Sequence, residues 1–161
     1  MLLGIDLGGT KIEGIVLKSK ENPEEIIRHR INTEEEKGYS QVINNIKSLV
    51  NHIENKINYK FKRLGIGTPG TIDPETGLLK NSNSQCLNGM PIQKDLAKAL
   101  DKIILIQNDA NCFALAETLL GSVKDQYPNA KNVFGIIIGT GVGGGVIIDG
   151  KTVYGNQGIG G

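Results

Sequence analysis

Two segments far apart in the chain follow one plan, in which an apolar strand turns on clustered glycines into a second strand. The first runs over residues 2–17 and turns at Gly8 and Gly9, and the second runs over residues 136–149 with its glycines in 139–145. The pattern predicts two β-hairpins with glycine-rich turns. Such turns leave backbone N–H groups uncovered, so a ligand with several anionic oxygens can approach them closely. Two hairpins of this kind could face each other across a cleft and hold a polyphosphate between them.

The first hairpin also carries a single carboxylate, Asp6, inside its apolar strand. A carboxylate in that position needs a partner, and beside a phosphate the partner is a divalent cation or its waters. We therefore expect phosphate oxygens at Gly8, Gly9 and Thr10, with Asp6 directed at the metal. The alternative is an ordinary hairpin turn, with Asp6 solvated and Lys11 on the surface.

Composition excludes several classes of function. The 161 residues suit about one domain, and 18 Lys and Arg against 17 Asp and Glu provide no basic field for nucleic acid. The only cysteines, Cys86 and Cys112, lack the Cys-x-x-Cys spacing, and no signal-like start is present, so a reduced cytoplasmic setting is expected. No apolar run approaches the roughly 20 residues of a membrane span.

The rest of the pattern predicts an α/β fold. An apolar stripe at three- and four-residue steps between Val42 and Ile57 predicts a helix lying on a sheet. The purely apolar run 103–106 predicts a strand in a sheet covered on both faces. Residues 122–132 are expected to form a loop or linker. Further strands are expected at 25–31 and 63–68, and further helices at 91–100 and 112–120.

Two polar stretches are candidate binding segments. Residues 78–89 are dense in amides, which suits a surface loop but also a neutral polyhydroxylated ligand, because amides both donate and accept. Asp109 lies just beyond the carboxyl end of a strand, where ligands collect in open α/β sheets. Helix capping would explain one of Asn108, Asp109 and Asn111, but not all three.

With these motifs assembled, the sequence resembles the sugar kinases of the ROK family (repressor, open reading frame, kinase), among the actin-like and hexokinase-like ATPases. DLGGTK at 6–11 is similar to the family's first phosphate motif, and GIGTPG at 65–70 to its connecting loop. NDAN at 108–111 is similar to its catalytic motif, and GTGVGGG at 139–145 to its second phosphate motif. The four motifs occur in the family's order over essentially the whole chain. Details within 28–30, 80–81 and 87–89 are most similar to bacterial fructokinases or mannokinases, although glucokinases and N-acetylhexosamine kinases share most of the pattern.

The resemblance implies an actin-like, ribonuclease H-like α/β fold with a mixed sheet flanked by helices. Residues 1–121 would form the N-terminal lobe, and 122–161 a linker and the first hairpin of an incomplete second lobe, because family members run about twice this length. The family's sugar-gripping Glu and His, its zinc site and its nucleoside pocket would lie beyond Gly161. No zinc is therefore expected in this chain, and we expect the chain to be inactive alone. A full-length protein is expected to be a cytoplasmic homodimer without nucleic-acid or membrane partners.

The resemblance also implies transfer of the ATP γ-phosphoryl group to a hexose hydroxyl, O6 or its equivalent in a ketose, with Mg²⁺. Asp109 would be the general base. The implied sugar-binding residues are Gly70, Thr71, Asn83, Asn108 and Asp109. The implied ATP-binding residues are Asp6, which would hold Mg²⁺ through water, Gly8, Gly9, Thr10, Lys11, Thr140 and Gly141.

Two other functions are considered. The ROK family also contains sugar-responsive repressors, but these carry a DNA-binding region ahead of the first phosphate motif, where this sequence has only Met1 and the strand. A non-catalytic fragment that binds sugar without turnover is the second alternative.

Overall fold

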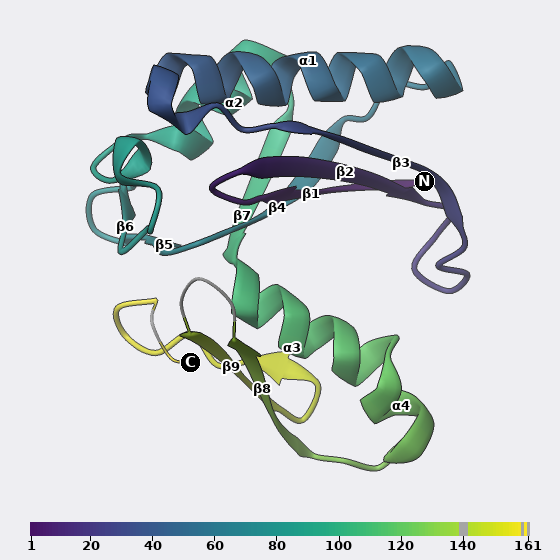
Figure 1. The fold of residues 1–161 in the computed structure, drawn as a ribbon. Coiled ribbons are helices and arrows are strands. Elements are labelled where there is room, and N and C mark those ends of the chain that lie inside the picture. The colour runs from purple at the N-terminus through teal and green to yellow at the C-terminus, as the bar shows by residue number, and fades with distance from the viewer. Residues whose placement is uncertain (139–141, 159, 161) are drawn as a thin grey trace. The chain divides into compact units, whose positions relative to one another are not determined.

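The computed structural model describes residues 1–138, 142–158 and 160. The chain divides into two compact units, Met1–Ile106 and Gln107–Gly161, each with its own sheet (Figure 1). This division falls earlier than the expected lobe boundary after residue 121. The assignment of residues to the lobes of a longer protein stays a prediction.

The first unit is built on a five-stranded mixed sheet. Its strands are β1 (Leu2–Leu7), β2 (Lys11–Leu17), β3 (Glu25–Asn32), β4 (Arg63–Thr68) and β7 (Ile103–Asn108). Their order is β3-β2-β1-β4-β7, with β1 antiparallel to β2 and parallel to β4. The hairpin and the third strand predicted from the apolar pattern are confirmed.

Shorter elements complete the first unit. Between the strands lie the 3-10 helices η1 (Glu35–Lys37) and η2 (Gln85–Leu87), the α-helices α1 (Tyr39–Ile57) and α2 (Ile92–Leu100), and the paired strands β5 (Thr71–Ile72) and β6 (Leu79–Lys80). Figure 1 shows α1 and α2 on the same side of the sheet. The predicted helices are therefore confirmed, whereas the small β5-β6 pair was missed.

α1 packs on the sheet through the apolar stripe that the sequence predicts. Five residues of the stripe are at most 1% exposed: Val42, Ile46, Leu49, Val50 and Ile53. Gly14 of β2 allows this close approach, because a Cβ there would lie 2.5 Å from the Cδ1 atom of Ile53. Burial of such a stripe supplies most of a helix's stability in a folded protein.

β7 corrects one expectation. The apolar run 103–106 predicted a strand covered on both faces, yet Ile103 is 62% exposed and Leu105 is 56% exposed, while Ile104 is buried. The prediction is wrong because β7 is last in the strand order and, within the described residues, α1 and α2 cover one face only.

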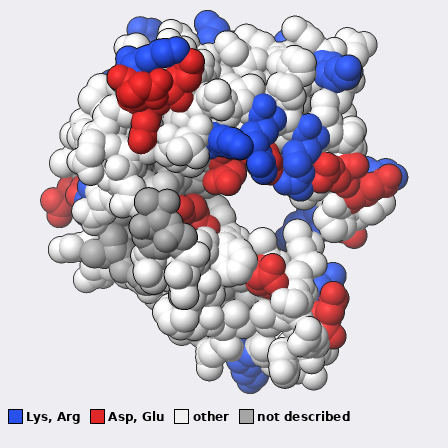
Figure 2. Space-filling model, viewed as in Figure 1, with Lys and Arg blue, Asp and Glu red and all other residues white. Residues whose placement is uncertain are grey.

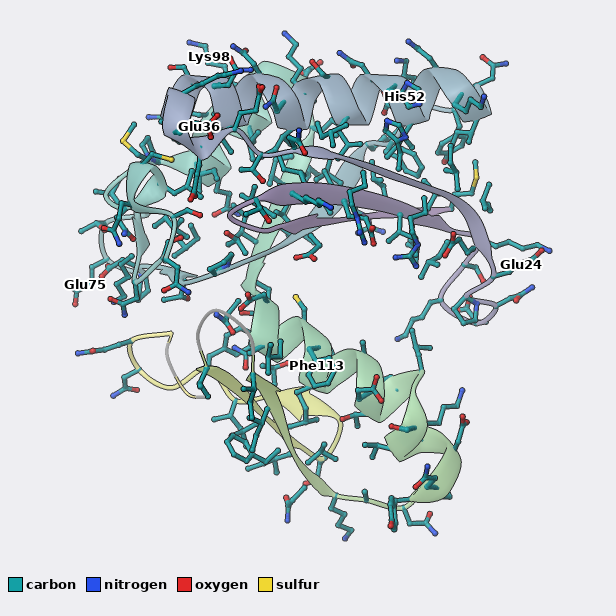
Figure 3. The ribbon with its side chains drawn as sticks, in the orientation of Figure 1. Glu24, Glu36, His52, Glu75, Lys98 and Phe113 are labelled. Carbon is teal, nitrogen blue, oxygen red and sulfur yellow. The ribbon has the colours of Figure 1, made fainter. Side chains whose placement is uncertain are left out.

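His52 is an exposed residue of α1. It extends from α1, and its ring stacks on that of His29 in β3 with centroids 4.1 Å apart and planes at 24° (Figure 3). The contact links helix and sheet at the edge strand.

A buried ion pair lies near the C-terminal end of α1. Glu54 is 2% exposed, accepts a hydrogen bond from the Phe61 N–H at 2.8 Å, and pairs with Lys102 at 2.8 Å and with Lys60 at 2.9 Å. Burial alone would raise the pKa of Glu54, but the hydrogen bonds from Lys102, Phe61 and Lys60 outweigh it and hold the pKa below its ordinary value of 4.5.

This pair predicts a loss of stability in acid. Because the pKa of Glu54 is lowered by folding, its contribution is present above about pH 4.5 and is lost as pH falls through the folded value. We expect the free energy of unfolding, measured by urea denaturation, to fall between neutral pH and about pH 3. Glu54→Gln should remove part of that slope, and an unchanged slope would contradict the assignment.

The second unit is a helix packed on a small antiparallel sheet. Its elements are α3 (Asp109–Leu119), α4 (Ser122–Gln126), β8 (Asn132–Ile138), β9 (Val142–Ile148) and β10 (Lys151–Thr152), with the strand order β10-β9-β8. The glycines of the strands make room for α3. A Cβ at Gly145 would lie 2.6 Å from the carbonyl oxygen of Ala110, and one at Gly135 would lie 2.7 Å from the Cβ of Ala114.

The strands of this unit agree with the predicted hairpin, with two corrections. Asp149 and Gly150 have φ of 47° and 73°, as a type I′ turn requires. The pattern predicts the second strand of the hairpin over 146–149, after the glycines, but β9 begins earlier, at Val142. The expected loop over 122–132 is partly wrong, because its first five residues form α4.

Candidate functional site

The turn of the first hairpin is held by backbone hydrogen bonds and by one buried threonine. The Gly8 N–H donates to the carbonyl oxygen of Lys11 at 3.0 Å. Thr33, which is fully buried, donates its hydroxyl to the Gly8 carbonyl at 2.6 Å and its N–H to the Thr10 carbonyl at 3.0 Å. The turn is thus supported from the end of β3, and Thr33 is a supporting residue that the sequence interpretation missed.

Glu35, which packs against Gly9, is a second residue that the sequence interpretation missed. Both carboxylate oxygens of Glu35 lie 3.6 Å from the position of a Cβ on Gly9, and the Ser84 Oγ lies 3.5 Å from it. The Glu35 Oε2 is buried without a hydrogen-bond partner among the described residues. Burial, together with the Glu35 charge, raises the pKa of the Cys86 thiol. The first hairpin therefore meets the amide-rich segment, residues 78–89, through Gly9, Glu35 and Ser84.

Asp6 is an exposed carboxylate at the end of β1 that leads into this turn. Its neighbours in the sheet are Glu13 on β2 and Gly67 on β4. Glu13 is ion-paired with Arg28 and Arg30. Burial would raise the pKa of Glu13, but the two guanidinium groups outweigh it and lower that pKa below its ordinary value.

The position of Asp6 fits a magnesium ion held partly by phosphate. Mg²⁺ in nucleotide sites is bound through one or two carboxylates, several waters and the phosphate oxygens. An exposed carboxylate beside the glycine turn offers that arrangement. No group of three or more His, Cys, Asp or Glu suited to a metal occurs among the described residues.

The connecting loop turns at Gly70, which has a φ of +84°. A Cβ on this residue would lie 2.3 Å from the Lys80 carbonyl oxygen and 2.8 Å from the Ser82 nitrogen, so β6 and the segment after it pass directly beside the loop. Thr71 is buried in β5, opposite Lys80. These two predicted sugar-binding residues are therefore placed against the amide-rich segment.

An ion pair between Lys80 and Asp73 holds the turn between β5 and β6. The Lys80 ammonium group donates to Asp73 at 2.8 Å. Together with the Thr76 and Glu75 N–H groups, it lowers the pKa of the Asp73 carboxyl to about 2.

Some side chains of the amide-rich segment hold the fold of the segment itself, and others remain available to a ligand. Asn88 accepts a hydrogen bond from the Ser82 N–H at 2.9 Å and donates to the Ser82 carbonyl at 2.9 Å, so its amide is used within the fold. Asn83 is exposed, and within the described chain its side chain has no hydrogen-bond partner. A hollow of about 590 Å³ surrounds it, lined by Asp73, Thr76, Lys80, Asn81, Asn83 and Asn88 among others. Its walls therefore offer mixed donors and acceptors.

Helix α3 begins at the predicted catalytic motif. Asn108 is its N-cap, and the Asn108 side chain accepts a hydrogen bond from the Asn111 N–H at 3.2 Å. Asp109 is half-buried in the first turn, where its Oδ1 accepts from the Ala110 N–H at 2.8 Å. Asn111 is 3% exposed, and its Oδ1 lacks a hydrogen-bond partner among the described residues. Helix capping thus explains Asn108. It does not explain Asp109 and Asn111, whose side chains remain for another role.

Two predicted phosphate-binding residues, Thr140 and Gly141, lie outside the described residues. Asp109 belongs to the second unit, and the first hairpin and Asn83 belong to the first. The predicted convergence of the catalytic carboxylate with both hairpins therefore stays a prediction.

Figure 2 shows basic and acidic side chains lying beside each other on the face in view. In the parts of the chain that the structure describes, no helix combines the length and the apolar character that crossing a membrane requires.

Comparison with known proteins gives concordant matches. A family model described as the ROK family matches residues 2–161. An N-acetyl-D-glucosamine kinase from Aliivibrio salmonicida is 39% identical over 161 residues, which is 100% of this chain and 51% of that protein. A second N-acetyl-D-glucosamine kinase, from Haemophilus influenzae, is 37% identical over the whole chain and 50% of its own length.

A solved structure agrees with these sequence matches. The crystal structure of a ROK hexokinase from Thermus thermophilus superimposes with a TM-score of 0.81 at 29% identity, over 98% of this chain and 50% of that one. The chain therefore spans about half the length of the relatives it matches.

Proposed function

Because this chain belongs to the ROK family, we propose that the full-length protein is an ATP-dependent sugar kinase. The observation that carries the proposal is the first hairpin, where an exposed Asp6 adjoins a glycine turn supported from behind by Thr33. This arrangement suits the binding of a magnesium-bound phosphate chain.

In the proposed reaction, the sugar hydroxyl attacks the terminal phosphorus of ATP. Asp109 takes the hydroxyl proton as the oxygen attacks, a role that typically contributes about 10²- to 10⁴-fold in rate. Asn83 and Asn108, with the backbone of Gly70 and Thr71, bind the other hydroxyls and fix the direction of attack.

In the proposed reaction, the two hairpins bind the phosphates of ATP. Gly8, Gly9, Thr10 and Lys11 of the first hairpin bind phosphate oxygens, as do Thr140 and Gly141 of the second. Asp6 would hold Mg²⁺ through water. When bound, the ion neutralises charge that develops on the phosphate oxygens during transfer.

We propose that the sugar is N-acetyl-D-glucosamine, because both relatives described above are named N-acetyl-D-glucosamine kinases. Fructose, mannose and glucose remain the alternatives from the sequence resemblance. The test is ADP release by the full-length protein with each of these sugars. We expect the highest kcat/KM with N-acetyl-D-glucosamine, and a clear preference for another hexose would replace this assignment.

The 161-residue chain alone is a separate case. Since it spans about half of its relatives, we expect it to release no ADP above background with any of the four sugars. Turnover by the chain alone would overturn this expectation. Sugar binding without turnover, measured by calorimetry, would support the view of the chain as a binding fragment.

The metal assignment predicts a selective kinetic defect. In the full-length protein, we expect Asp6→Ala to raise the KM for Mg-ATP at least tenfold and to change the KM for sugar little, because Asp6 lies at the phosphate turn. Glu25→Ala, which removes an exposed carboxylate from β3 of the same sheet, is the matched control. Equal effects of Asp6→Ala on both KM values would count against the metal role.

A further inference from the structure

Oxygen atoms surround a small space beside Gly9, at the point where a larger residue would carry its side chain. The position of a Cβ on Gly9 lies 3.5 Å from the Ser84 Oγ and 3.6 Å from each carboxylate oxygen of Glu35. Ser84 is 2% exposed, and the Glu35 Oε2 is buried. We call the space between Gly9, Glu35 and Ser84 the Gly9 site. All three residues belong to the first unit, so the site is described within one compact body.

Glu35 is the carboxylate of the acidic run 34–36 that the chain leaves without a counter-charge. Glu34 is ion-paired with Lys37, and Glu36 is exposed to water. Among the described residues, no ion pair includes Glu35, and the Glu35 Oε2 has no hydrogen-bond partner. A buried carboxylate oxygen without a partner is costly, because it has lost its water and gained nothing in return. A cation at the Gly9 site would remove that cost.

The ligand set of the Gly9 site favours a cation with a single charge. Protein sites for Ca²⁺ and Zn²⁺ combine several carboxylate, His or Cys ligands. No group of three or more such residues occurs in the part of the chain that the structure describes. The Gly9 site offers one carboxylate and one hydroxyl, so a single positive charge balances it. K⁺ is bound in proteins by uncharged and charged oxygen atoms that replace its hydration shell.

We propose that the Gly9 site binds a monovalent cation such as K⁺, with Glu35 and Ser84 as its protein ligands. The cation would lie beside the turn at which the proposed function places the phosphates of ATP. An unbalanced Glu35 carboxylate repels those phosphates, and a bound cation cancels the repulsion. The cation therefore strengthens nucleotide binding. This second effect rests on the proposed kinase function, whereas binding of the cation itself does not.

Thallium(I), which replaces K⁺ and gives a strong anomalous X-ray signal, tests the site directly. Crystals of the full-length protein are soaked in thallium(I) without nucleotide or sugar. We expect an anomalous peak between the Glu35 carboxylate and the Ser84 hydroxyl. The peak should be lost in Glu35→Gln and kept in Glu36→Gln, which makes the same change at an exposed position of η1. A water molecule without anomalous signal at this position in the wild-type protein would overturn the proposal.

Nucleotide affinity tests the effect of the cation in solution. Calorimetry of the full-length protein uses a non-hydrolysable ATP analogue with Mg²⁺, in potassium chloride or in tetramethylammonium chloride at equal ionic strength. We expect K⁺ to raise the affinity of the wild-type protein about tenfold, within the usual range for coupled sites. Glu35→Gln removes the charge that K⁺ balances, so its affinity should be equal in both salts and close to the wild-type value in K⁺.

The control and the contrary outcomes separate the cation site from the kinase proposal. Glu36→Gln should respond to K⁺ as the wild-type protein does. A wild-type affinity that is equal in both salts, or a Glu35→Gln variant that still responds to K⁺, would overturn the coupling of Glu35 to the phosphate turn. A wild-type protein that binds the analogue in neither salt would contradict the proposed kinase function, and the thallium peak would still decide whether the Gly9 site holds a cation.

Discussion

Asp109→Asn in the full-length enzyme is expected to reduce kcat by more than tenfold, and by about 10²- to 10⁴-fold if Asp109 is the general base. Asparagine has nearly the same shape and cannot accept the hydroxyl proton. It keeps a side-chain oxygen that can still accept the Ala110 N–H now bound to Asp109 at 2.8 Å. The start of α3 should therefore persist, and the affinity for sugar should change little. Steady-state ADP release gives kcat, and calorimetry without nucleotide gives the affinity for sugar.

The control for this variant is Asp125→Asn, which makes the same chemical change at an exposed position in α4. It should leave kcat unchanged. If Asp109→Asn keeps more than about a tenth of the wild-type kcat, Asp109 is not the base. If it loses both activity and thermal stability, the side chain is acting chiefly in the fold of α3.

The predicted family is confirmed over residues 2–161, and the actin-like α/β class agrees with the solved ROK hexokinase. The local elements were predictable where one physical signal dominated. Apolar residues at helical spacing predicted α1, and the apolar strands around Gly8 and Gly9 predicted β1 and β2.

Elements at the margins of the sheets were less predictable. The run 103–106 has the composition of an interior strand, but composition does not reveal that β7 is last in the sheet order. α4 is only five residues long, too short for a periodic apolar signal. β5 and β6 are two residues each and depend on the turn that Asp73 and Lys80 hold together.

The supporting residues of the candidate site escaped sequence analysis because their roles depend on distant neighbours. Glu35 stands in an acidic run that is typical of a solvated loop, yet its carboxylate is packed under Gly9. Thr33 follows a strand without any local sign that its hydroxyl bonds to Gly8. Asn88 was grouped with the candidate ligand-binding amides, although its hydrogen bonds hold the Ser82 backbone. The motif residues themselves, such as Asn108, were recognisable because their roles are local.

Gly70→Ala is expected to have the second largest effect, through the shape of the connecting loop. Two costs combine at this position. A φ of +84° disfavours any residue with a Cβ by roughly 1–2 kcal/mol, and overpacking in a tight site typically costs about 1–3 kcal/mol more. The overpacking is severe because the new Cβ would lie 2.3 Å from the Lys80 carbonyl oxygen, a backbone atom that cannot rotate away. We expect the free energy of unfolding of the full-length protein to fall by about 2–5 kcal/mol.

Gly77→Ala separates the two costs. Gly77 also has a positive φ, of +71°, but a Cβ there would have no atom within 4 Å, so only the backbone cost applies. The difference between the two variants in urea denaturation therefore measures the contact of the connecting loop with Lys80 and Ser82. If Gly70 and Thr71 bind the sugar as proposed, Gly70→Ala should also raise the KM for sugar, whereas Gly77→Ala should not. A Gly70 variant with lowered stability and an unchanged sugar KM would remove the connecting loop from the sugar site and leave it a purely structural turn.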